Sequence, residues 1–189
     1  ESRLGPLKLK PEHVTTAMSV VGSKSLLPQK LPMDEETKDA VFTALACGDV
    51  KAMEVLLDES GESRIRAVEA QRVILEYELL FIAARNGSAQ MVALLLDIDG
   101  IDVNAVSRQK QGVPALAQAC LCGHSAVVEV LLAHDSILVN KGNNVDGRTA
   151  LITACDQGFV KVAKILLDHP AIDVNQATTD NGTTPLLIA

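Results

Sequence analysis

The stretch "ALITACDQGFVKVAKILLDHPAIDVN", from Ala150 to Asn175, contains two short apolar segments with Gly158 between them. Three earlier stretches have the same plan: "AVFTALACGDVKAMEVLL" at 40–57, "LLFIAARNGSAQMVALLL" at 79–96 and "ALAQACLCGHSAVVEVLL" at 115–132. Their glycines follow one another at intervals of 39, 36 and 35 residues. A catalytic site needs its residues once, whereas a pattern that returns at a fixed period indicates a stacked structural unit.

Each feature of this pattern has a structural reason. The glycine is predicted to end a first helix in a left-handed turn, which glycine adopts without a Cβ clash. The alanine four residues before it lets neighbouring helices approach closely, and the closing leucine pair gives the second helix a bulky buried face. We therefore expect Leu95, Leu131 and Leu166 to be buried between neighbouring repeats. One unit alone has too little apolar surface for a core, and stacking supplies a shared one.

The pattern also predicts where the helices lie. Helix pairs are expected near 39–47/50–58, 78–86/89–97, 114–122/125–133 and 149–157/160–168, with a further first helix near 184–189. The segments that close at Asn104, Asn140 and Asn175 are expected to be extended and to end in a turn, because a β-branched valine precedes an asparagine in each.

Composition narrows the fold and function classes. Apolar residues make up 48% of the 189-residue chain but aromatic residues only 2%, so the core must consist of Leu, Val, Ile and Ala, which suits closely packed helices. The formal net charge of −7 argues against a surface that binds nucleic-acid phosphates. The four cysteines lie in helix-like contexts rather than loops, which favours reduced thiols in an intracellular protein, cytoplasmic or nuclear. No run approaches the roughly 18 apolar residues that a membrane span needs.

The first 35 residues differ from the rest, and we interpret them as a linker or flexible arm that precedes an array at 36–189. Residues 1–32 contain four of the seven prolines and no periodic apolar pattern, and they carry five basic against two acidic side chains. A short docking motif or the tail of a preceding domain is the alternative. Asp34 is expected to cap the first helix, with Glu35 and Glu36 in its first turn. The chain begins without Met, and we expect it to be part of a longer protein.

The repeated residues closely resemble the ankyrin repeat, over about 36–189. "GRTALITACDQGFVKVAKILLDHPAIDVN" (147–175) follows that family's pattern nearly position by position, and the family's Thr-Pro-Leu recurs at 184–186. The resemblance implies an all-α solenoid of helix–turn–helix units with short hairpin fingers, about four full repeats plus the start of a fifth. It also implies a monomeric array that binds another protein or another domain of its own chain.

This sequence departs from the family pattern in three places. The family's Thr-Pro-Leu-His is nowhere intact, since its slots read "DAVF", "ELLF", "PALA", "TALI" and "TPLL". The first repeat ends in a segment three or four residues longer than the others, so we expect a remodelled finger and a longer helix in the second repeat. The apolar "PLLIA" at 185–189 lacks the polar outer face of a terminal repeat, and we expect the array to continue.

The resemblance places the partner-binding surface on the concave face, formed by the finger tips and the ends of the first helices. The candidate partner-binding residues are Arg85, Asn86, Lys110, Gln111, Val113, Leu121, Val145, Asp146, Arg148, Asp156, Gln157, Asp180, Asn181 and Thr183. They are mostly polar and vary between repeats. Both a partner-binding surface and a solvated loop face without a partner would have these properties. The alternative function is that of a regulatory or substrate-presenting domain of a larger enzyme, channel or effector.

The sequence favours neither an enzyme nor a metal site. No P-loop, dinucleotide fingerprint or nucleophile elbow occurs, and we expect no cofactor. Cys120, Cys122 and His124 fall at an interhelix turn and lack the usual zinc spacing. The aspartates at 97, 99 and 102 lack the glycine and glutamate of a calcium loop.

Asn104, Asn140 and Asn175 each follow a leucine by eight residues, which resembles the pattern that asparaginyl hydroxylases accept in ankyrin repeats. The structural interpretation explains the same residues without an enzyme, because leucine packs, valine extends and asparagine turns. If these asparagines are modified, we expect Asn104 and Asn175 to react before Asn140, which lacks the preceding Asp-Val.

Overall fold

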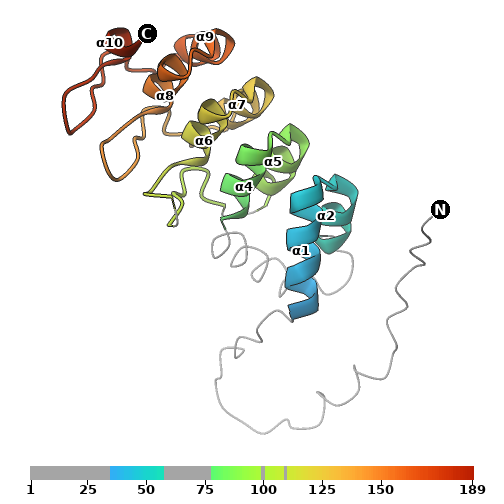
Figure 1. The fold of residues 1–189 in the computed structure, drawn as a ribbon. Coiled ribbons are helices and arrows are strands. Elements are labelled where there is room, and N and C mark those ends of the chain that lie inside the picture. Colours follow the sequence, from blue (N-terminus) through green and yellow to red (C-terminus); the bar gives the residue numbers. More distant parts are fainter. Residues whose placement is uncertain (1–34, 58–77, 99–100, 109) are drawn as a thin grey trace, which may run out of the picture. The chain divides into compact units, whose positions relative to one another are not determined.

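The fold consists of paired antiparallel helices in chain order (Figure 1). The computed structural model describes residues 35–57, 78–98, 101–108 and 110–189, all within one compact unit that spans Pro32–Ala189. The arm at 1–34, the cap at Asp34 and the remodelled first finger at 58–77 therefore lie outside the described residues. The predicted longer helix of the second repeat lies outside them as well.

The helices confirm the predicted pairs, mostly to within a residue at each end. They are α1 (Glu35–Cys47) with α2 (Val50–Leu57), α4 (Leu79–Asn86) with α5 (Ala89–Leu96), α6 (Ala115–Leu121) with α7 (Ser125–Leu132), α8 (Ala150–Asp156) with α9 (Val160–Leu167), and α10 (Pro185–Ile188). Helix α1 differs, because it begins at Glu35 rather than near residue 39 and so includes the last residue that we assigned to the arm. Its first turn is acidic, which the helix dipole favours.

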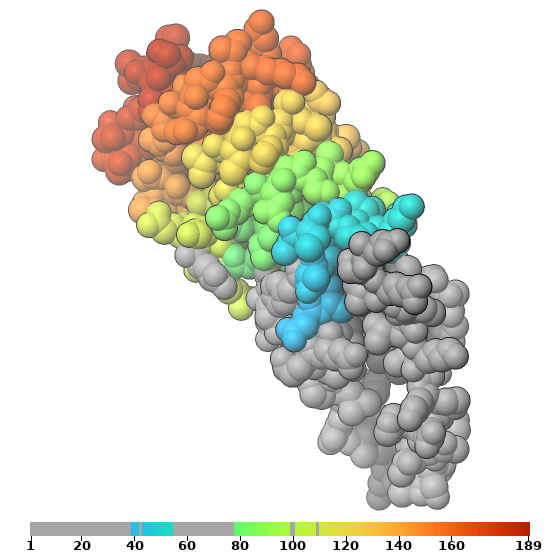
Figure 2. Space-filling view, turned by 45° about the vertical axis from the view of Figure 1, so that its right-hand side comes forward, coloured from blue at the N-terminus to red at the C-terminus, as the bar shows by residue number. Residues whose placement is uncertain are grey.

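Each helix packs on its own partner and on the corresponding helix of the next repeat. The first helices α1, α4, α6, α8 and α10 contact one another in succession, and so do the second helices α2, α5, α7 and α9. In the space-filling view the colours of successive repeats follow one another in bands (Figure 2). The stabilising contacts are therefore those between nearest neighbours, as in other repeat arrays.

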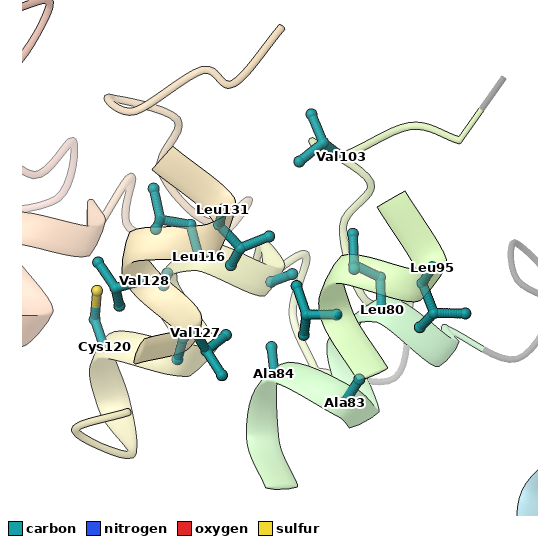
Figure 3. Packing of buried hydrophobic residues seen from close by; sticks show 14 of the residues in the cluster. Leu80, Ala83, Ala84, Leu95, Val103, Leu116, Cys120, Val127, Val128 and Leu131 are labelled. Carbon is teal, nitrogen blue, oxygen red and sulfur yellow. The ribbon is translucent and has the colours of Figure 1, made fainter. Parts of the chain in front are cut away.

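The core lies between the helix layers, and it confirms the predicted pattern. Leu95, Leu131 and Leu166 are fully buried, as are the helix-facing alanines Ala119 and Ala154. Figure 3 shows this layer between the second and third repeats, where leucine and valine side chains of one helix pair face the small alanines of its neighbour. Small residues on one side and branched residues on the other allow close approach of the helices.

Two of the turn glycines, Gly87 and Gly123, also contact an aromatic ring from the next repeat. Gly87 and Gly123 have φ of 78° and 73°, the left-handed region that favours glycine. A Cβ added at Gly87 would lie 2.7 Å from the His124 ring, and one at Gly123 would lie 2.9 Å from the Phe159 ring. The His124 ring also makes a hydrogen bond between Nε2 and the Arg85 carbonyl (3.0 Å). His124, which was predicted to lie in a turn, thus also joins two repeats.

Two of the closing asparagines, Asn104 and Asn140, tie their repeat to the next, which goes beyond the turn role predicted for them. Asn140 Nδ2 donates to the Ala171 carbonyl (2.7 Å), and its Oδ1 accepts from the Asp173 N–H (2.8 Å). Asn104 makes the same pair of bonds with Ser136 and Leu138, at 2.7 and 2.8 Å. We call this arrangement the asparagine clamp. Hydroxylation of Asn104 or Asn140 would require these bonds to break first. The structure does not test that modification, which stays a prediction.

We expect Asn140→Ala to lower the free energy of unfolding by about 1–2 kcal/mol, because its two hydrogen bonds to the main chain of Ala171 and Asp173 are lost and each contributes about 0.5–1 kcal/mol. The matched control is Asn175→Ala, since among the described residues the Asn175 carboxamide makes no hydrogen bond and the side chain is exposed. Urea unfolding followed by circular dichroism measures both variants. Equal costs for the two substitutions would contradict a role for the clamp.

Candidate functional site

The fingers are the segments that precede α6, α8 and α10, and they comprise residues 105–108 with 110–113, 141–149 and 176–184. Each turns at a glycine with left-handed φ, namely Gly112, Gly147 and Gly182. Backbone bonds also join neighbouring tips. Asn144 N–H donates to the Gln111 carbonyl (3.1 Å), and one repeat later Thr179 N–H donates to the Asp146 carbonyl (2.7 Å). These bonds hold the three tips in one row.

We define the inner face as the surface formed by these fingers and the last turns of α4, α6 and α8. All the predicted partner-binding residues lie on these segments. Ten are exposed, namely Arg85, Asn86, Lys110, Gln111, Leu121, Val145, Asp156, Gln157, Asp180 and Asn181, while Val113, Asp146, Arg148 and Thr183 are half-buried. The inner face includes two exposed apolar side chains, Leu121 (44% exposed) and Val145 (61% exposed).

Arg148 connects a finger to a first helix. Its Nη1 lies 2.6 Å from Asp156 Oδ2 at the end of α8, and its Nε lies 4.0 Å from Asp146 Oδ2 within the same finger. Gln157 Nε2 donates to the same Asp156 oxygen (3.2 Å). Four predicted residues from two separate stretches of sequence are thus brought into one hydrogen-bonded group.

Two carboxyl groups at this end of the inner face, those of Asp156 and Asp180, have pKa values below the usual range. The hydrogen bond from Arg148 lowers the pKa of Asp156, and a hydrogen bond from Thr178 together with the charge of Arg148 lowers the pKa of Asp180. One guanidinium among the three carboxylates of Asp146, Asp156 and Asp180 leaves this end of the inner face with a surplus of negative charge. The side chains of these ion pairs lie at the surface and are 29–33% exposed, so the pairs add little stability.

Two of the predicted residues have structural roles as well. Asn86 Nδ2 donates to the Leu45 carbonyl of the preceding repeat (3.3 Å). Asn181 Oδ1 accepts from the Thr178 hydroxyl and from the backbone and hydroxyl of Thr183, which closes the last finger. These contacts account for asparagine at both positions independently of any partner.

Two residues that were not predicted as site residues, Glu78 and Asn144, also shape the fingers. Glu78 has a left-handed backbone (φ 56°), and its carboxylate accepts from the Ser107 hydroxyl and the Arg108 N–H, which fixes the start of the first described finger. The Asn144 side chain packs over Gly112. The repeat period could have identified Asn144 from the sequence. Thr179 occupies the matching position one repeat later and packs over Gly147 in the same way. No sequence signal marks Glu78.

The cysteines and titratable residues within the ranges that the structure describes do not form the arrangements that metal sites require. No group of three or more His, Cys, Asp or Glu side chains there could hold a metal ion. The four cysteines are free thiols, and burial raises the pKa of Cys120 to about 12, so that this thiol is unreactive at neutral pH. None of the described helices combines the length and apolar character that a membrane span requires.

Comparison with known families agrees with this geometry. A family model described as ankyrin repeats (3 copies) matches residues 64–141 and 136–189, which together span more than half of the chain. The chain therefore belongs to the ankyrin-repeat family, whose members generally bind proteins.

Two curated relatives contain a similar array within much longer chains. A probable E3 ubiquitin-protein ligase, XBOS31, from Oryza sativa subsp. japonica is 35% identical over 98 residues, which cover 52% of this chain and 21% of that protein. The human BCL-6 corepressor-like protein 1 is 29% identical over 141 residues, which cover 71% of this chain and 8% of that protein. The chain thus spans about a fifth or less of the length of these relatives.

Proposed function

We propose that this chain is a non-catalytic protein-interaction module that binds a partner through its inner face, the concave face of the family. The observation that supports this most directly is the pairing of exposed apolar side chains with rigidly held charges. Leu121 and Val145 are exposed, and on the same face Arg148 pairs with Asp156. Interfaces combine an apolar centre with a polar rim in this way. The module acts as a monomer inside the cell and binds neither nucleic acid nor membrane.

A second candidate is a regulatory or substrate-presenting domain of a larger protein. The small share of each relative that this chain covers favours it, since the matched arrays lie within proteins several times as long. The inner face would then bind either a substrate or another domain of the same polypeptide. Both candidates require the same surface.

The first test is selection of a displayed library of random peptides on the 189-residue chain. We expect Gln157→Arg and Asp146→Lys to weaken selected peptides about tenfold, because both place a charge change on the inner face. Lys161→Glu and Glu129→Lys are the controls, since both residues are exposed on second helices. Fluorescence anisotropy measures the dissociation constant of the selected peptides for the two inner-face variants and the two controls. Recovery of no peptides, or loss of binding only in the second-helix variants, would contradict the proposal.

A further inference from the structure

The inner face carries a graded sequence of charges at matched positions. Two residues before the turn glycines Gly87, Gly123 and Gly158, the first helices carry Arg85, Leu121 and Asp156. These three side chains are exposed and occupy the same position in α4, α6 and α8, which pack against one another in succession. The order from the N-terminal to the C-terminal repeat is therefore cation, apolar group, anion.

The finger tips carry the same order independently. Two residues before the tip glycines Gly112, Gly147 and Gly182 lie Lys110, Val145 and Asp180, which are all exposed. The backbone bonds from Asn144 and Thr179 keep these tips in a row. Two separate rows of the inner face thus change from positive through apolar to negative in the same direction along the array.

The surplus charge at the C-terminal end persists despite the internal ion pairs. Arg148 is engaged by Asp156 at 2.6 Å and lies near Asp146, so it neutralises one of the carboxylates that surround it. Asp180 remains exposed and ionised at neutral pH, because hydrogen bonding holds its pKa low. A partner that brings a cation to this end meets a fixed group of negative charge and does not have to order it.

We infer that the inner face binds an extended segment of a partner protein with an acidic residue, an apolar residue and a basic residue along it. The acidic residue lies against the second repeat, the apolar residue against the third and the basic residue against the fourth. Packed helices lie about 8–10 Å apart, and an extended chain advances about 3.3 Å per residue, so these three residues are spaced about three apart. This inference rests on the proposed function and specifies its ligand.

The test compares three synthetic peptides that share the same central leucine and spacers. Their flanking residues are acidic and basic, acidic and acidic, or basic and basic. We expect the bipolar peptide to bind the 189-residue chain about tenfold more tightly than either unipolar one, and its advantage to shrink as salt screens both ends. Fluorescence anisotropy at low and high ionic strength measures the three dissociation constants.

A charge reversal sharpens the test. Arg85→Glu reverses the cation of the helix row and leaves Lys110 in the finger row, so the variant should lose the preference for the bipolar over the basic–apolar–basic peptide. Lys161→Glu changes the net charge by the same amount on an exposed second-helix site and should leave the preference unchanged. If the basic–apolar–basic peptide binds the unmodified chain as tightly as the bipolar one, attraction to the net charge explains binding and the inference is overturned. The random-library selection still decides the proposed function separately.

Discussion

Leu131→Ala is expected to lower the free energy of unfolding by about 2–5 kcal/mol, the range for truncation of a large buried side chain. Leu131 is fully buried in α7, which packs against α5 on one side and α9 on the other. A cavity here weakens two neighbouring interfaces, so the array should also lose cooperativity and unfold in two steps. Urea unfolding monitored by circular dichroism measures the cost, and hydrogen exchange shows which repeats open first.

The control for this variant is another leucine-to-alanine change in the same repeat. Leu138 is 58% exposed, and its substitution by alanine should change stability by no more than about 0.5 kcal/mol. A similarly small cost for Leu131→Ala would show that the helix layers do not pack as described.

Gly142→Ala is expected to have the next largest effect, about 1–3 kcal/mol, through overpacking. A Cβ added at Gly142 would lie 2.2 Å from the Gly147 carbonyl oxygen, which is a backbone atom and cannot rotate away. The finger at 141–149 must therefore open, and it carries both Val145 and Arg148. The variant should lose peptide binding as well as stability, as anisotropy and urea unfolding would show.

Val145→Ala separates these two effects, because it removes an exposed side chain from the same finger without crowding its backbone. It should weaken peptide binding but leave the free energy of unfolding within about 0.5 kcal/mol of the original value. If Gly142→Ala unfolds at the same urea concentration as Val145→Ala, the finger is not as tightly closed as the structure indicates.

Much of the fold could be predicted from the sequence, because the features that define each unit are local. The glycine, the alanine four residues before it and the leucine pair locate both helices of a repeat, and they do so within a residue or two. The start of α1 shows the limit of the apolar pattern, which marks the buried face and not the helix end. The capping pattern at Asp34 and Glu35 indicated the earlier start that the structure shows at Glu35.

The contacts between repeats could not be predicted in the same way. His124 over Gly87 joins residues 37 positions apart, and no local pattern links an imidazole to a particular glycine. The pairing of Arg148 with Asp156 likewise depends on how a finger folds back toward its helix. The inner-face residues were predicted as a set from the resemblance, but the sequence did not indicate which of them contact one another.

The asparagine clamp has a consequence for how the sequence can change. Each of the two carboxamides bonds to main-chain atoms, so the asparagine clamp does not depend on which side chains the clamped residues carry. Ser136 and Ala171 differ in chemistry, and so do Leu138 and Asp173, yet the two clamps have the same bond lengths. The clamped positions are therefore free to drift between repeats and between species while the alignment of one repeat on the next is preserved.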